Sequence, residues 1–78
     1  MMIEAVLEAS SIEKHEVACR DFCVQVLPKA LWNEFDIRAR LIEDGIVQNN
    51  PELIEWGREE IRDFMALYHE EFLPPHSY

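Results

Sequence analysis

Glycine and proline are scarce in this sequence. The only glycines are Gly45 and Gly57, and the prolines stand at positions 28, 51, 74 and 75. A turn-rich β-sandwich or barrel needs more chain breakers than this. A glycine-rich phosphate loop and a glycine-framed nucleophilic serine are also absent. The scarcity favours a few long helices, interrupted at Pro28 and near Pro51.

Basic side chains are also few. Seven lysines and arginines stand against sixteen aspartates and glutamates, which gives a formal net charge of −9. Direct binding to DNA, RNA or anionic lipid requires a cationic surface, so we expect none of these partners. The charge is compatible with a basic protein partner.

Long apolar runs are missing as well. The longest fall far below the ~20 residues of a membrane span. The first residues, MMIEAVLEASS, carry acids where a signal peptide needs bases. We therefore expect a cytoplasmic protein without membrane association, in which Cys19 and Cys23 stay reduced.

Apolar residues, in contrast, are abundant. They make up 49% of a chain of 78 residues, which we expect to form a single domain over 1–78, with 73–78 as a flexible tail after Pro74. A core of this size supplies only ~3–5 kcal/mol of stability. The surplus of apolar surface predicts that some of it is covered by another molecule, and we expect a homodimer.

The clearest helix is predicted over residues 51–72. Asn50 can cap its first turn, and the missing N–H of Pro51 costs nothing there. At about 100° per residue, one face collects Leu53, Ile54, Gly57, Ile61, Phe64, Met65, Tyr68 and Phe72. A face this wide predicts contact with two neighbours, or with one neighbour and a second subunit, and Gly57 within it predicts a close helix crossing.

Two further helices are predicted before it. The first runs from about 11 to 27 and starts at a capping box from Ser10 to Glu13; its heptad-spaced seam consists of Ile12, His15, Cys19, Phe22 and Val26. The second runs from about 29 to 44, stops at Gly45, and is followed by a loop over 46–50. It has two apolar strips: Leu31, Trp32, Phe35, Ala39 and Ile42 on one side, and Ala30, Ile37 and Leu41 on the other. Residues 2–9 form a short helix or an extended arm. The chain is thus predicted to be an all-α antiparallel bundle of three main helices, with a possible short N-terminal one.

His15, Cys19 and Cys23 form the sharpest chemical cluster. All three are plausible zinc or copper ligands, but residues eight apart lie ~12 Å apart along a helix. One ion would take two adjacent members and need His69, a carboxylate or a second subunit to complete its shell. The alternative is that both cysteines pack in the core, with His15 at the rim. We favour packing, and therefore predict neither a bound metal nor another cofactor.

The last helix also carries an acidic row, formed by Glu52, Glu59, Asp63 and Glu70. Such a row can face a basic groove of a partner, imitate a phosphate backbone, or simply be a solvated surface. Arg58 and Arg62 lie near it, and Glu55 with Arg58 and Glu59 with Arg62 have the spacing of ordinary surface pairs.

The preferred interpretation is a protein-binding regulator or inhibitor. Trp32 and Trp56 stand at the edges of their apolar faces and are predicted to be exposed anchors. Together with Glu52, Glu59, Asp63 and Glu70 they form the predicted partner-binding set. The alternatives are a metal- or redox-sensing module that uses Cys19 and Cys23, and an acidic mimic of nucleic acid that blocks a DNA-binding protein. An enzyme is not expected, because no catalytic constellation is present and a small bundle has little room for a pocket of roughly a few hundred Å³.

Overall fold

The computed structural model of the chain describes residues 2–72, and side chains from residue 3 to residue 68. In chain order the elements are α1 (Met2–Leu7), α2 (Ile12–Gln25), a 3₁₀ turn (Lys29–Leu31), α3 (Trp32–Gln48) and α4 (Pro51–Phe72). The described part contains no strand. The prediction of an all-α bundle with three main helices is confirmed, and the N-terminal segment is helical. The tail predicted over 73–78 lies outside the described residues.

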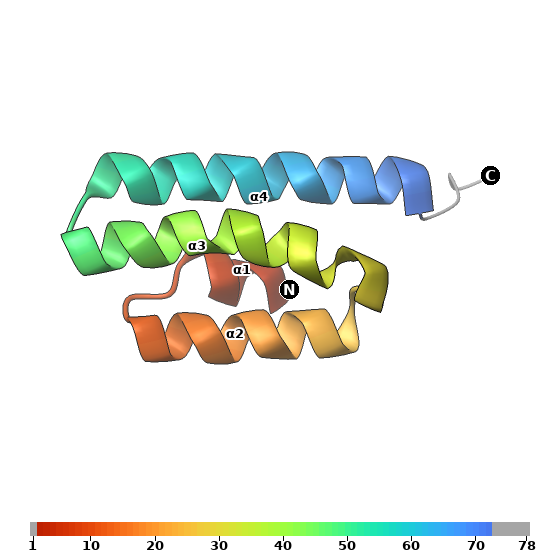
Figure 1. Cartoon of the computed structure of the whole chain (residues 1–78), viewed down its shortest axis with the longest axis horizontal. Coiled ribbons are helices and arrows are strands. Elements are labelled where there is room, and N and C mark those ends of the chain that lie inside the picture. Colours follow the sequence, from red (N-terminus) through yellow and green to blue (C-terminus); the bar gives the residue numbers. More distant parts are fainter. Residues whose placement is uncertain (1, 73–78) are drawn as a thin grey trace.

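The helices are arranged around α3. Figure 1 shows α4, α3 and α2 side by side, with α3 in the middle and α1 behind, where it packs against α2. The short helix also reaches α4, because the Arg58 Nε donates a hydrogen bond of 2.7 Å to the carbonyl of Leu7. Val6 of α1 is fully buried, so this helix completes the core.

The N-terminus of α2 lies one residue later than predicted. Ser11, not Ser10, is the N-cap, and its side chain accepts a hydrogen bond of 3.3 Å from the backbone N–H of Lys14. Both serines precede the apolar repeat, so the pattern alone does not choose between them. The helix ends at Gln25, two residues before the predicted end, and Pro28 follows in the connection to the next element.

The prediction that the third helix stops at Gly45 is wrong. Helix α3 continues to Gln48, and Asn49 provides the left-handed residue after its end, with φ of 51°. Gly45 is buried, and a Cβ there would lie 2.8 Å from the backbone nitrogen of Ile54. This glycine therefore allows the close approach of α4 and does not terminate α3.

The start of α4 is as predicted. The Oδ1 of Asn50 accepts hydrogen bonds from the backbone N–H groups of Glu52 (3.1 Å) and Leu53 (3.3 Å). These bonds satisfy two of the free donors of the first turn. The connection from α3 is therefore only Asn49 and Asn50, which holds the two longest helices antiparallel.

The core lies where α2, α3 and α4 meet beneath α1. Rings from the three helices follow one another across it, with centroids of Phe22 and Phe35 5.2 Å apart and those of Phe35 and Phe64 6.2 Å apart. The close crossing predicted at Gly57 is confirmed, because a Cβ there would lie 2.8 Å from Ile42 Cγ1. The buried apolar residues are Val6, Phe22, Leu27, Phe35, Ala39, Ile42, Ile61, Phe64 and Tyr68.

None of the helices in the described part of the chain combines the length and the apolar character that crossing a lipid bilayer requires.

Candidate functional site

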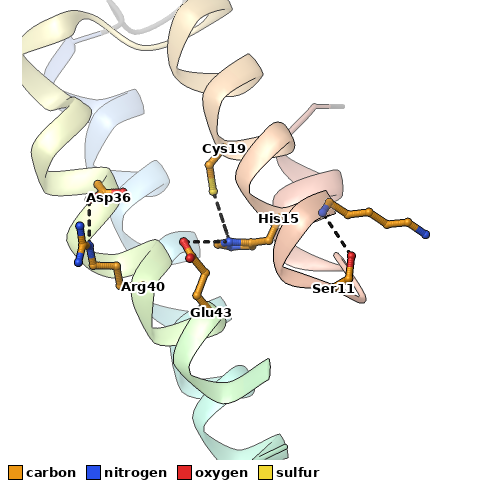
Figure 2. A network of polar contacts seen from close by, with 7 residues as sticks. Ser11, His15, Cys19, Asp36, Arg40 and Glu43 are labelled. Carbon is orange, nitrogen blue, oxygen red and sulfur yellow. Dashed lines mark hydrogen bonds and ion pairs between the residues drawn. The ribbon is translucent and has the colours of Figure 1, made fainter. Parts of the chain in front are cut away.

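The histidine of α2 lies in the core between α2 and α3. His15 is fully buried, so the prediction that it lies at the rim is wrong. Its Nδ1 lies 3.4 Å from Oε2 of Glu43 on α3 (Figure 2). The Cys19 Sγ lies 3.6 Å from Nε2 and 3.8 Å from Nδ1. The two distances are nearly equal, so they single out neither ring nitrogen as the partner of the sulfur.

The protonation states of this network follow from burial. Burial lowers the pKa of His15, although the neighbouring Glu43 carboxylate acts in the opposite direction. Burial, reinforced by Glu43, raises the pKa of the Cys19 thiol to about 12. Burial also raises the pKa of Cys23, with Asp36 adding to the effect. Activated cysteines have lowered pKa values, so these thiols are held in their unreactive form.

The predicted metal cluster has only part of its expected geometry. His15 and Cys19 are adjacent as anticipated, and Glu43 adds a carboxylate. However, no group of three metal-binding side chains surrounds a common point among the described residues. The side chain of His69 lies outside the described residues.

A groove of about 690 Å³ runs between α2 and α3 beside this network. Its lining includes Cys19, Cys23, Trp32 and Glu43, with Asp36 and Arg40 also present. The volume is larger than sequence reasoning allowed for in so small a bundle. Its thiols are protonated near neutral pH, and Arg40 is already paired with Asp36 at 3.1 Å. The groove therefore offers space without an activated nucleophile.

Trp32 lines the groove and is not fully exposed as predicted, and its role in binding a partner stays a prediction. Its side chain is half-buried, and its Nε1 donates to the carbonyls of Leu27 (2.9 Å) and Cys23 (3.0 Å). These carbonyls belong to the end of α2 and the residues that follow it, where intrahelical partners run out. The indole thus joins α2 to α3. No signal in the sequence distinguishes this tryptophan from one that anchors a partner.

Trp56, in contrast, is exposed. Its side chain is 55% accessible, and that of Leu67 on the same helix is 53% accessible. They stand two and nine residues from Arg58, which contacts α1, so both lie on the side of α4 away from α1. Half-buried Leu53 precedes Trp56 by three residues and therefore shares this side of α4.

Helix α3 adds two apolar residues to the same face of the molecule. Leu41 and Ile37 stand two and six residues before Glu43, which contacts α2, so they lie on the side of α3 away from α2. Leu41 adjoins α4 at Gly57, and Ile37 is 59% accessible. Helices α3 and α4 pack along each other, and α1 packs against α2. The side of α4 away from α1 and the side of α3 away from α2 therefore form one surface. We call it the open face, and it consists of Ile37, Leu41, Leu53, Trp56 and Leu67.

The acidic row borders the open face along α4. Glu52, Glu59 and Asp63 are exposed, whereas the side chain of Glu70 lies outside the described residues. The predicted pair of Glu55 with Arg58 is present at 3.1 Å. The predicted pair of Glu59 with Arg62 is not, because Arg62 lies 3.5 Å from Glu55 instead. The two arginines lower the pKa of Glu55, and among the described side chains neither of them lies within ion-pair distance of Glu52, Glu59 or Asp63.

No protein family model, curated protein or solved structure matches this chain.

Proposed function

We propose that this chain is a protein-binding module, a regulator or inhibitor that acts by contact through the open face. The observation that carries the proposal is the exposure of Trp56 and Leu67 on α4 and of Ile37 on the neighbouring helix, all more than half accessible. A large aromatic surrounded by aliphatic side chains, with charges at the rim, is the composition of a binding hot spot.

The distribution of the other apolar residues supports this choice of surface. Phe22, Phe35 and Phe64 are buried in the core, whereas the ring of Trp56 is left exposed. The exposed Val17 and Val24 on α2 are small side chains two turns apart, as occurs on most protein surfaces. The open face is where an exposed ring adjoins several aliphatic neighbours.

The setting of the proposed module is the cytoplasm. Cys19 and Cys23 are free thiols, and the chain contains no disulfide among its described residues. Unpaired cysteines fit a reducing compartment. The net charge of −9 favours a basic partner and disfavours direct contact with nucleic acid.

Affinity capture with three forms of the chain tests the proposal. The wild type is compared with a Trp56→Ala/Leu67→Ala variant and with a Val17→Ala/Val24→Ala control, which removes equally exposed apolar side chains from α2. Circular dichroism verifies that each form is folded. A protein retained by the wild type and the control but lost by the first variant supports the proposal. A protein retained equally by all three contradicts the assignment of the open face.

A homodimer through the same face is the competing occupant, and it follows from the same surplus of apolar surface. The mass of the particle in solution separates the two cases. A mass of two chains that falls to one in the Trp56→Ala/Leu67→Ala variant would identify the second copy as the occupant.

A nucleic-acid mimic is the second candidate function, because Glu59 and Asp63 lack a basic partner among the described lysines and arginines. Such a mimic acts through charge. Its binding would be abolished by Glu59→Lys/Asp63→Lys and unaffected by Trp56→Ala, whereas loss of binding in both variants favours the module that uses the open face.

A further inference from the structure

We propose that the partner presents an amphipathic helix whose apolar ridge is flanked by lysines or arginines, and that this helix lies along α4 on the open face. The inference rests on the proposed function and specifies the chemistry of its occupant. It is carried by the way acidic and apolar side chains alternate along one side of α4.

A carboxylate lies among the apolar residues that α4 contributes to the open face. Glu60 follows Trp56 by four residues and precedes Leu67 by seven, so the three side chains share one side of the helix. Glu60 is half-buried, and no lysine or arginine of the described part lies within ion-pair distance of it. A carboxylate placed between two large apolar anchors favours a ligand with a cation among its own apolar groups.

The border of the strip carries charge of the same sign. Glu59 and Asp63 are exposed beside it, while Arg58 and Arg62 are held on the other side of α4 by Glu55. The α4 arginines are therefore kept away from the open face. Exposed ion pairs add little affinity, so the apolar ridge would supply most of the binding. The charges would set the orientation and the rate of encounter.

A helix fits this surface better than an extended peptide. The described residues contain no strand, and so no sheet edge to which a peptide could add. The strip from Leu53 to Leu67 is straight and about 20 Å long, which matches about four turns of a partner helix. Ile37 and Leu41 extend the apolar surface onto α3, so that a partner's ridge can contact both helices.

A second copy of this chain is disfavoured as the occupant by charge. A symmetric dimer brings the same patch of each copy together. Glu59, Glu60 and Asp63 would then approach their own counterparts, and each copy carries a net charge of −9. The rows of like charge would oppose association unless the apolar contact outweighed them.

Two synthetic helical peptides of equal length test the inference. Both carry the same leucine ridge at positions i, i+3, i+4 and i+7, and differ only in lysines or glutamates at the flanking positions. Calorimetric titration into the full chain measures each affinity. We expect the lysine peptide to bind at least about tenfold more tightly, and to lose affinity as salt is added.

Charge reversal on the chain locates the contact. Glu60→Lys should weaken the lysine peptide by about tenfold or more and improve the glutamate peptide. Asp21→Lys, at an exposed site on α2, is the matched control and should change neither affinity beyond a small effect of net charge. A lysine peptide that responds to Asp21→Lys and not to Glu60→Lys would overturn the inference.

The remaining outcomes separate this inference from the proposed function. Equal binding of both peptides, lost in Trp56→Ala/Leu67→Ala, would keep the open face as a docking site and overturn the basic partner. Binding of neither peptide would also overturn it, while the capture experiment decides independently whether the open face binds a protein. A two-chain mass that depends on Trp56 would assign the face to a second copy.

Discussion

At the scale of single residues, Gly57 allows a close approach of α3 and α4. Gly57→Ala should lower the free energy of unfolding by about 1–3 kcal/mol, although alanine is the better helix former by about 1 kcal/mol. The added methyl would lie 2.8 Å from Ile42 Cγ1 and 2.9 Å from the Ile42 nitrogen, and the latter is backbone that cannot rotate away. Urea unfolding followed by circular dichroism measures the change.

Asn33→Ala is the control for this substitution, because Asn33 is exposed on α3. It gains helix propensity without meeting a neighbour and should change stability by no more than a few tenths of a kcal/mol. If Gly57→Ala proved as stable as the wild type, the close crossing would be wrong.

His15 predicts how stability depends on pH. Folding lowers its pKa from the ordinary value of 6.5, so the unfolded chain binds the proton more readily. The stability associated with neutral His15 is present above pH 6.5 and is lost as the pH falls from there toward the folded value. Urea midpoints between about pH 7.5 and about pH 5.5 should therefore decrease, and should decrease less in His15→Asn.

Glu43→Gln sharpens this test. The carboxylate of Glu43 favours the protonated ring, so its removal should lower the pKa of His15 further and steepen the loss of stability on acidification. Equal slopes in the wild type and in His15→Asn would show that other groups dominate the dependence.

At the scale of helices, the indole of Trp32 makes two hydrogen bonds that link α3 to the end of α2. Trp32→Phe keeps a large ring but removes the donor to the carbonyls of Leu27 and Cys23, at an expected cost of about 1–2 kcal/mol. Trp56→Phe is the matched control and should be nearly neutral, because that ring is exposed. Urea unfolding of the two variants compares them, and equal stabilities would contradict the role assigned to Trp32.

Features decided within one helix could be predicted from the sequence. The apolar period of α4, the cap at Asn50 and the pair of Glu55 with Arg58 depend on residues within a turn of one another. The exposure of Trp56 was predicted for the same reason, since the residue lies at the edge of the apolar face of its own helix.

Features decided between helices were missed. Gly45 has the sequence signature of a helix end, but its role comes from Ile54 on the next helix. His15 shows the spacing of a seam residue, and its full burial depends on Glu43 across the α2–α3 contact. Trp32 and Trp56 occupy similar positions in their helical patterns, and only the end of α2 distinguishes them.

At the scale of the whole molecule, each side of α3 has a different neighbour. On one side, α2 and α1 close the core over His15 and Val6. On the other, α4 packs closely at Gly45 of α3 and at its own Gly57, and leaves Trp56 and Leu67 outside. The bases of α4 are retained beside Glu55, and Arg38 of α3 lies 4.9 Å from the ring centre of Phe64, so on α4 itself the open side carries apolar and acidic groups. This segregation suits recognition of a basic partner better than it suits self-association.

The stability of the molecule should therefore be independent of the open face. Trp56→Ala/Leu67→Ala should leave the free energy of unfolding within about 0.5 kcal/mol of the wild type, because both side chains are largely exposed. Ile61→Ala on the buried side of α4 should cost about 2–5 kcal/mol.

The urea midpoint of the wild type should also stay constant over about a tenfold range of chain concentration, as for any monomer. A midpoint that rises with concentration in the wild type, but not in the double variant, would mean that the apolar contact between two copies overcomes the repulsion of their acidic rows.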